Sequence, residues 1–133
     1  MTTLSHLRMW VRTAALSALL AVAMASPKAT AQEVVSFQQD VFPIIELRCL
    51  ECHQPGGSGY EASGLDLRTY EGLMNGTKHG SIVTPGNAFE SNLIAVIDQR
   101  TDPTIWMPHN RKPLSKCERL LLRFWVSQGA KNN

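Results

Sequence analysis

The chain has 133 residues, a formal net charge of +2 and a sequence pI of about 8.6. The positive excess comes from Arg8, Arg12 and Lys28. Beyond them, residues 32–133 carry 10 Lys+Arg and 11 Asp+Glu, a formal charge of −1. This length suits one small domain, and the near-neutral balance gives no indication of nucleic-acid binding.

The first residues have the pattern of an export signal. A positively charged start is followed by an apolar run over residues 14–25 and by Ala29-Thr30-Ala31, a small-x-small cleavage site. The run is too short to span a bilayer comfortably, although an uncleaved membrane anchor is the alternative. We therefore predict a signal peptide over residues 1–31, a domain over residues 32–133, and a periplasmic or otherwise exported protein.

The first helix of the domain is expected to begin near Asp40, whose carboxylate can act as the N-cap. Pro43 then falls in the first turn, where a missing N–H costs little. The apolar residues Ile44 and Ile45 continue at helical spacing into a pair of cysteines. We expect the helix to carry that pair at its C-terminal end, and residues 55–59, Pro-Gly-Gly-Ser-Gly, to end it and open a loop.

The cysteine pair belongs to Cys49-Leu50-Glu51-Cys52-His53, which reads C-x-x-C-H, the attachment pattern of a c-type haem. Two thiols three residues apart on one face of a helical turn can add to the two vinyl groups along one haem edge. His53 is then placed under the ring, where its imidazole can bind the iron. The motif predicts one covalent haem c, held by Cys49, Cys52 and His53.

A zinc site is the rival interpretation of these residues. It would need four good ligands, so Cys117 and a histidine such as His79 or His109 would have to complete the set. A second C-x-x-C or an H-x-x-x-H is absent from the sequence. Cys117 is instead expected to behave as a small buried hydrophobe, because we place it on the apolar stripe of the last helix.

The remaining elements are short until the last helix. Gly76 is expected to end a helix that contains Tyr70, and residues 83–86, Val-Thr-Pro-Gly, predict a type II turn. Ser91 can cap a further helix. Ser115 and Glu118 match a capping box that opens the last helix, which Gly129 ends. Strand patterns are weak, so the predicted fold class is all-α.

These motifs together resemble a small monohaem c-type cytochrome of the cytochrome c fold. The resemblance is strongest to the planctomycete-type cytochrome c domain and runs over about residues 37–130. It implies a haem-bearing N-terminal helix, a long C-terminal helix, and short helices and loops between them. It depends on the order of several blocks in the sequence: residues 40–45, 49–53, 64–67, 82–86, 91–94, 106–108 and 114–130.

The resemblance implies that Met107, in Met107-Pro108, is the second axial ligand of the iron. A thioether is a soft ligand that favours ferrous iron and raises the reduction potential. His109 departs from the family pattern, which usually has a second proline there, so His109 is the rival ligand. Met74 is expected to pack in the core, and His79 to lie in a solvated loop. The metal ligands predicted are thus His53 and Met107.

Two functions follow from a haem site of this kind. The first is electron transfer by an iron that keeps both axial ligands, with transient redox-protein partners, membrane contact only through respiratory partners, and a monomeric, non-enzymatic carrier. The alternative is a haem enzyme or a gas or peroxide sensor with an open or labile sixth iron position. Peroxidase-type activity needs such a vacancy, and His109 could serve as its acid–base group.

Overall fold

The computed structural model describes residues 33–133, so the predicted signal peptide over residues 1–31 lies outside the described residues. Within residues 33–133 the secondary structure is helical and no strand is present, which confirms the all-α prediction. None of these helices has both the length and the apolarity to cross a bilayer. In chain order the elements are a π-helical segment η1 (Phe37–Val41), α1 (Phe42–Arg48), α2 (Ser58–Ser63), α3 (Tyr70–Asn75), α4 (Asn92–Ile97), a 3-10 turn η2 (Pro103–Ile105) and α5 (Lys116–Ser127).

The first helical segment begins one turn earlier than predicted. Ser36 is the N-cap of η1, and its Oγ accepts a hydrogen bond from the Gln39 amide at 3.2 Å. Asp40 is not the N-cap. Its Oδ2 accepts from the Ser36 amide at 2.8 Å and so closes a reciprocal cap. Pro43 lies in the first turn of α1, as predicted.

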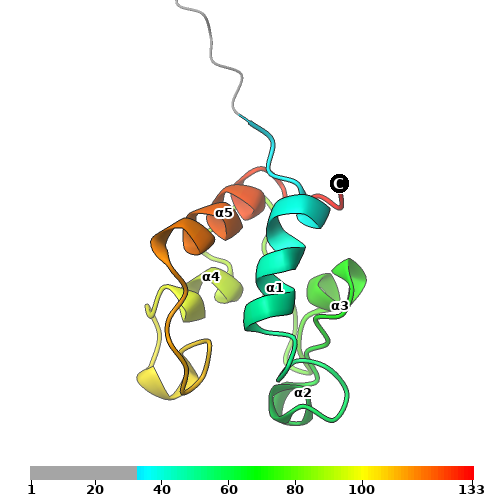
Figure 1. Cartoon of the computed structure of the whole chain (residues 1–133), viewed down its shortest axis with the longest axis vertical. Coiled ribbons are helices and arrows are strands. Elements are labelled where there is room, and N and C mark those ends of the chain that lie inside the picture. The colour runs from blue at the N-terminus through cyan, green and yellow to red at the C-terminus, as the bar shows by residue number, and fades with distance from the viewer. Residues whose placement is uncertain (1–32) are drawn as a thin grey trace, which may run out of the picture. The chain divides into compact units, whose positions relative to one another are not determined.

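The start of the described chain is bonded to its C-terminal residues. The Phe37 amide donates to Asn133 Oδ1 at 2.9 Å, and the Gln38 amide donates to the Asn133 carbonyl at 3.0 Å. The Val35 amide donates to Gln128 Oε1 at 2.8 Å. The top of α1 and the C-terminus therefore lie together (Figure 1).

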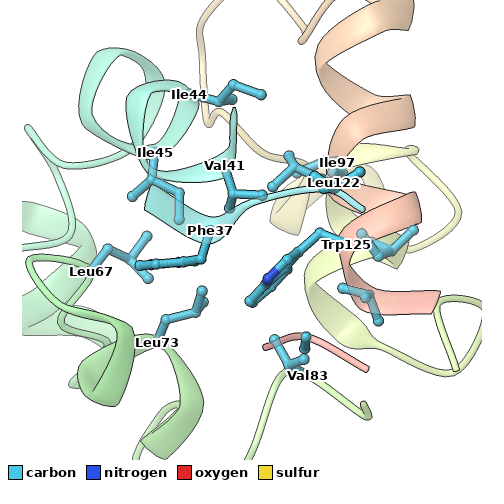
Figure 2. Close-up of a cluster of buried hydrophobic side chains, with 14 of the residues drawn as sticks. Phe37, Val41, Ile44, Ile45, Leu67, Leu73, Val83, Ile97, Leu122 and Trp125 are labelled. Atoms are coloured by element: carbon cyan, nitrogen blue, oxygen red, sulfur yellow. The ribbon is translucent and has the colours of Figure 1, made fainter. Parts of the chain in front are cut away.

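A cluster of three aromatic rings lies at the centre of the core. Phe37 is 5.5 Å from Trp125 and 5.2 Å from Tyr70, measured between ring centroids. Trp125 is 1% exposed and its indole N–H donates to the Lys131 carbonyl at 2.9 Å. Apolar side chains from η1, α1, α3, α4, α5 and the loops on either side of α3 surround these rings, including Leu67, Leu73 and Val83 (Figure 2). The core thus joins the two ends of the domain to each other and to segments from the middle of the chain.

Helix α5 has the predicted boundaries. Ser115 Oγ accepts from the Glu118 amide, and a Glu118 carboxylate oxygen accepts from the Ser115 amide at 2.6 Å, which confirms the capping box. Gly129 follows the helix with a φ of +103°, a conformation that favours glycine. The prediction for Cys117 is wrong, because this residue is exposed. The buried face of α5 is formed by Leu122, Trp125 and Val126.

The predicted turns between α3 and α4 are also present. Gly76 caps α3 with a φ of +78°. The Asn87 amide donates to the Thr84 carbonyl at 2.9 Å around Gly86, whose φ of +83° matches a type II turn. Ser91 is the N-cap of α4, but its fully buried hydroxyl bonds to this turn instead of to the helix.

Candidate haem site

The C-x-x-C-H motif lies just beyond α1 rather than on it. The helix ends at Arg48, and Cys49 is its C-cap. The amides of Cys52 and His53 both donate to the Cys49 carbonyl at 3.1 Å, so the motif still forms one compact turn. Cys49 and Cys52 are free, half-buried thiols. The turn therefore presents both thiols together, although the helix before it ends earlier than predicted.

A helix that was not predicted, α2, packs on the far side of this turn. The Tyr60 amide donates to the Cys52 carbonyl at 2.9 Å. A Cβ added at Gly57 would lie 2.5 Å from that same carbonyl oxygen, and one added at Gly59 would lie 2.7 Å from His53 Cε1. The two glycines therefore allow the backbone of α2 to approach the motif closely. The sequence analysis placed them in a loop and did not predict this contact.

His53 is a half-buried imidazole held by its backbone. Its carbonyl accepts from the Leu67 amide at 2.8 Å. Its Nδ1 is buried without a hydrogen-bond partner among residues 33–133. Burial lowers the pKa of His53. The nearby Leu65 backbone acts in the opposite direction, although it forms no hydrogen bond with Nδ1. The imidazole is thus kept neutral, which is the form that binds a metal.

Cys49 lies in a less polar environment than a free cysteine. Burial raises the pKa of its thiol to about 11, while the neighbouring Arg48 guanidinium acts in the opposite direction. Burial therefore favours the protonated thiol over the thiolate at this position.

Met107 lies in the loop between α4 and α5. Its side chain is partly buried against the core cluster. Its amide donates to the Val96 carbonyl at 3.2 Å, which attaches the loop to the end of α4. The Trp106 indole donates to the Thr101 carbonyl at 2.9 Å, a bond within the loop. The Met107-Pro108 peptide bond is cis.

The other candidate ligands lie in different surroundings. His109 and His79 are exposed, whereas Met74 is partly buried against the core. In the part of the chain that the structure describes, no three His, Cys, Asp or Glu side chains form a group that could hold a metal ion. The zinc interpretation, which required Cys117 and a histidine to join the motif, therefore gains no support.

An ion pair and two hydrogen bonds to the backbone connect the motif region to the loop that follows Met107, and a second ion pair connects it to α5. Glu51, inside the motif, forms a bidentate pair with Arg111, with N–O distances of 2.8 and 2.9 Å. Arg48, directly before the motif, donates to the carbonyls of Lys112 and Pro113 at 2.8 and 3.2 Å and pairs with Glu118 at 3.1 Å. These contacts join residues 60 to 70 positions apart, so the sequence pattern gave no sign of them.

Burial also distinguishes the segment that contains the haem motif and the segment that contains Met107 from the rest of the domain. Neither residues 46–64 nor residues 98–113 contain a buried apolar residue; all of the buried apolar residues lie elsewhere. The two segments meet at the Arg111–Glu51 pair, and α2 and the loop containing η2 both lie at the end of the view away from the C-terminus (Figure 1). Two half-buried thiols, a neutral imidazole and partly buried apolar residues such as Leu50 and Met107 are the groups that haem c requires. The residues present fit this cofactor.

An all-α fold with a C-x-x-C-H turn of this form is typical of a c-type cytochrome. The family model described as Planctomycete cytochrome C matches residues 49–109, just under half of the chain. The match begins at Cys49 and includes His53 and Met107, and it confirms the predicted resemblance to the planctomycete-type cytochrome c domain over this segment. The family implies covalent haem c with its iron. Comparison with curated proteins and with solved structures gives no significant match.

Proposed function

We propose that the protein is an electron carrier with one haem c, attached through Cys49 and Cys52 and ligated by His53 and Met107. The observation that carries the proposal is the junction between the motif and the loop after Met107, where Arg111 pairs with Glu51. A carrier needs an iron ligand on each side of the ring, and this junction supports a methionine loop that stays close to the motif.

The chain's own residues supply attachment, orientation and exclusion of water. The turn at Cys49 offers both thiols to one cofactor edge, and Gly59 lets α2 pack on the His53 ring and restrict its movement. Bound haem would supply an iron that alternates between the ferric and ferrous states. Retaining the same two ligands in both states keeps the structural change during electron transfer small.

The alternative, a haem enzyme or sensor with an open sixth position, has less support from the residues around Met107. His109 is the nearest histidine in sequence and is exposed. Met107 is partly buried and its backbone is bonded to α4. Buried surroundings and a fixed backbone favour retention of the thioether over exchange with a substrate.

The proposed setting follows from the sequence. Residues 1–31 support export, and a periplasmic or otherwise exported carrier would meet redox proteins transiently, through an interface below about 1,200 Å². We propose a monomer without enzymatic function, which contacts a membrane only through respiratory partners and does not bind nucleic acid.

An optical spectrum of the purified holoprotein tests the proposal. Met–iron ligation gives a near-infrared sulfur-to-iron charge-transfer band in the ferric protein and slow carbon monoxide binding in the ferrous protein. We expect Met107→Ala to keep the covalent haem, lose this band and bind carbon monoxide rapidly, with His109→Ala as the matched control that keeps the band. If the wild-type protein lacks the band and binds carbon monoxide rapidly, the carrier proposal is wrong.

A further inference from the structure

The loop that carries Met107 contains no buried apolar residue between residues 98 and 113; the next one is Leu114, which is 3% exposed. Before Met107, the loop is attached to α4 through the Val96 carbonyl, and the hydrogen bond from the Trp106 indole to the Thr101 carbonyl lies within the loop. After Met107, the side-chain contacts that reach the haem motif are those of Arg111 with Glu51 and of Arg48 with the 112–113 backbone. Between Met107 and the buried Leu114, the position of the loop therefore depends on polar contacts.

These contacts alternate in charge along the junction. The motif side presents a cation, Arg48, and then an anion, Glu51; α5 presents Glu118 to the first, and the loop presents Arg111 to the second. Glu118 does not move with the loop, but a displacement of the loop toward Arg48 would bring the Arg111 and Arg48 guanidinium groups together, which is unfavourable. The alternation thus specifies one position of the loop as well as attaching it.

The two pairs differ in strength. Arg48 and Glu118 are 22% and 19% exposed, and the guanidinium also donates to two carbonyls. Arg111 and Glu51 are 48% and 73% exposed, so solvent screens their attraction. Hydrogen bonds to charged groups contribute more than exposed ion pairs, so Arg48 is the stronger contact and Arg111–Glu51 the weaker.

We propose that Arg48, Glu51 and Arg111 are positioning residues that hold residues 107–113 against the haem motif and thereby keep Met107 on the iron. We call this set the latch. The inference rests on the proposed function, because it takes Met107 to be the axial ligand. The latch residues act through the loop and do not themselves touch the iron.

Titration of the ferric holoprotein with imidazole measures the latch. Imidazole can bind iron only when Met107 has left, so its apparent affinity rises with the fraction of protein in which the loop is displaced. The loss of the sulfur-to-iron band reports binding directly. We expect Arg111→Glu and Glu51→Arg each to raise the apparent affinity for imidazole about two- to fivefold, and Arg48→Gln to raise it about tenfold or more.

The double variant Glu51→Arg/Arg111→Glu exchanges the two charges and re-forms the pair, so its imidazole affinity should return close to the wild-type value. Arg68→Glu is the matched control, because Arg68 makes an equally close bidentate pair with Asp66 that does not reach the Met107 loop. We expect Arg68→Glu to leave the imidazole affinity unchanged. If Arg48→Gln fails to mature, the exposed Glu51 and Arg111 variants still decide the question.

The outcomes separate the two proposals. If the wild-type band is present but the single variants bind imidazole like the wild type, the latch is wrong and the carrier proposal stands. The latch is also wrong if the exchanged pair binds imidazole as tightly as the single variants. If the wild type has no sulfur-to-iron band, Met107 is not the ligand, and both proposals fail.

Discussion

The aromatic cluster around Trp125 and the haem motif belong to the same domain but are held in different ways. Phe37, Tyr70 and Trp125 are packed ring against ring, with hydrogen bonds from the tyrosine and tryptophan to the C-terminal backbone. Residues 46–64, which contain the motif, and residues 98–113, which contain Met107, have no buried apolar residue and depend on backbone bonds and ion pairs. The difference indicates a domain whose stability comes from one region and whose chemistry comes from the other, where haem would complete the packing.

The largest expected effect is on the packed region. Trp125→Ala should lower the free energy of unfolding by about 3–5 kcal/mol, because it removes a fully buried indole. Chemical denaturation of the holoprotein measures this change. Phe124→Ala, one position away on α5 and 46% exposed, is the control and should change stability by less than about 0.5 kcal/mol. Equal losses for the two variants would contradict the description of the core.

Gly59→Ala tests the contact between α2 and the haem motif, because helix propensity alone predicts a more stable protein and the contact predicts a less stable one. In an exposed helix interior this change stabilises by about 1 kcal/mol. Here the added Cβ would lie 2.7 Å from the His53 ring, so we expect a loss of about 1–3 kcal/mol together with a shifted reduction potential. Denaturation and redox titration measure both effects, with Ser58→Ala on the same helix as control. A more stable variant with an unchanged potential would show that α2 does not restrict His53.

Ser115→Ala affects the boundary between the two regions. Loss of the N-cap of α5 should cost about 1 kcal/mol, because the Glu118 amide loses its hydrogen bond to Ser115 Oγ. Thermal unfolding measures the loss. Ser127→Ala, at the other end of the same helix and exposed, should have almost no effect; a similar loss there would mean that the capping box contributes little.

The smallest effect expected is the pH dependence that comes from Glu118. Burial alone would raise the pKa of this carboxyl, but hydrogen bonds with Ser115 and the Arg48 charge outweigh burial and lower it. A lowered folded-state pKa contributes stability above the unfolded value of about 4.3, and the contribution is lost as the pH falls through the folded value. Glu118→Gln should therefore lose at most about 1 kcal/mol at pH 7 and show a flatter decline below pH 4. A parallel acid profile in wild type and variant would contradict this.

The sequence predicted features that depend on a few neighbouring residues. The C-x-x-C-H turn, the Ser115–Glu118 box and the glycines at 76, 86 and 129 were found because local spacing determines them. Ser36 was missed as the first cap because Asp40 looked equally suitable, and the reciprocal bond between them is not visible in composition. The prediction for Cys117 failed for a geometric reason: at 100° per residue it lies roughly 130° from the centre of the buried face of α5.

Features that depend on distant contacts could not be predicted. Helix α2 contains Gly59, a residue that usually weakens a helix, and it makes sense only beside the His53 ring. Arg111 had several possible partners, and its pairing with Glu51 requires the fold to bring residues 60 positions apart together. The predictions of export and of the four haem-binding residues, Cys49, Cys52, His53 and Met107, stay predictions.

The bonds between Asn133 and residues 36–38 close the described domain into a ring. The segment that leads into Cys49 and Cys52 therefore has its full set of contacts only when Trp125 and Asn133 are in place. Removal of residues 129–133 would loosen the segment before the motif, although those residues lie far from it in the sequence.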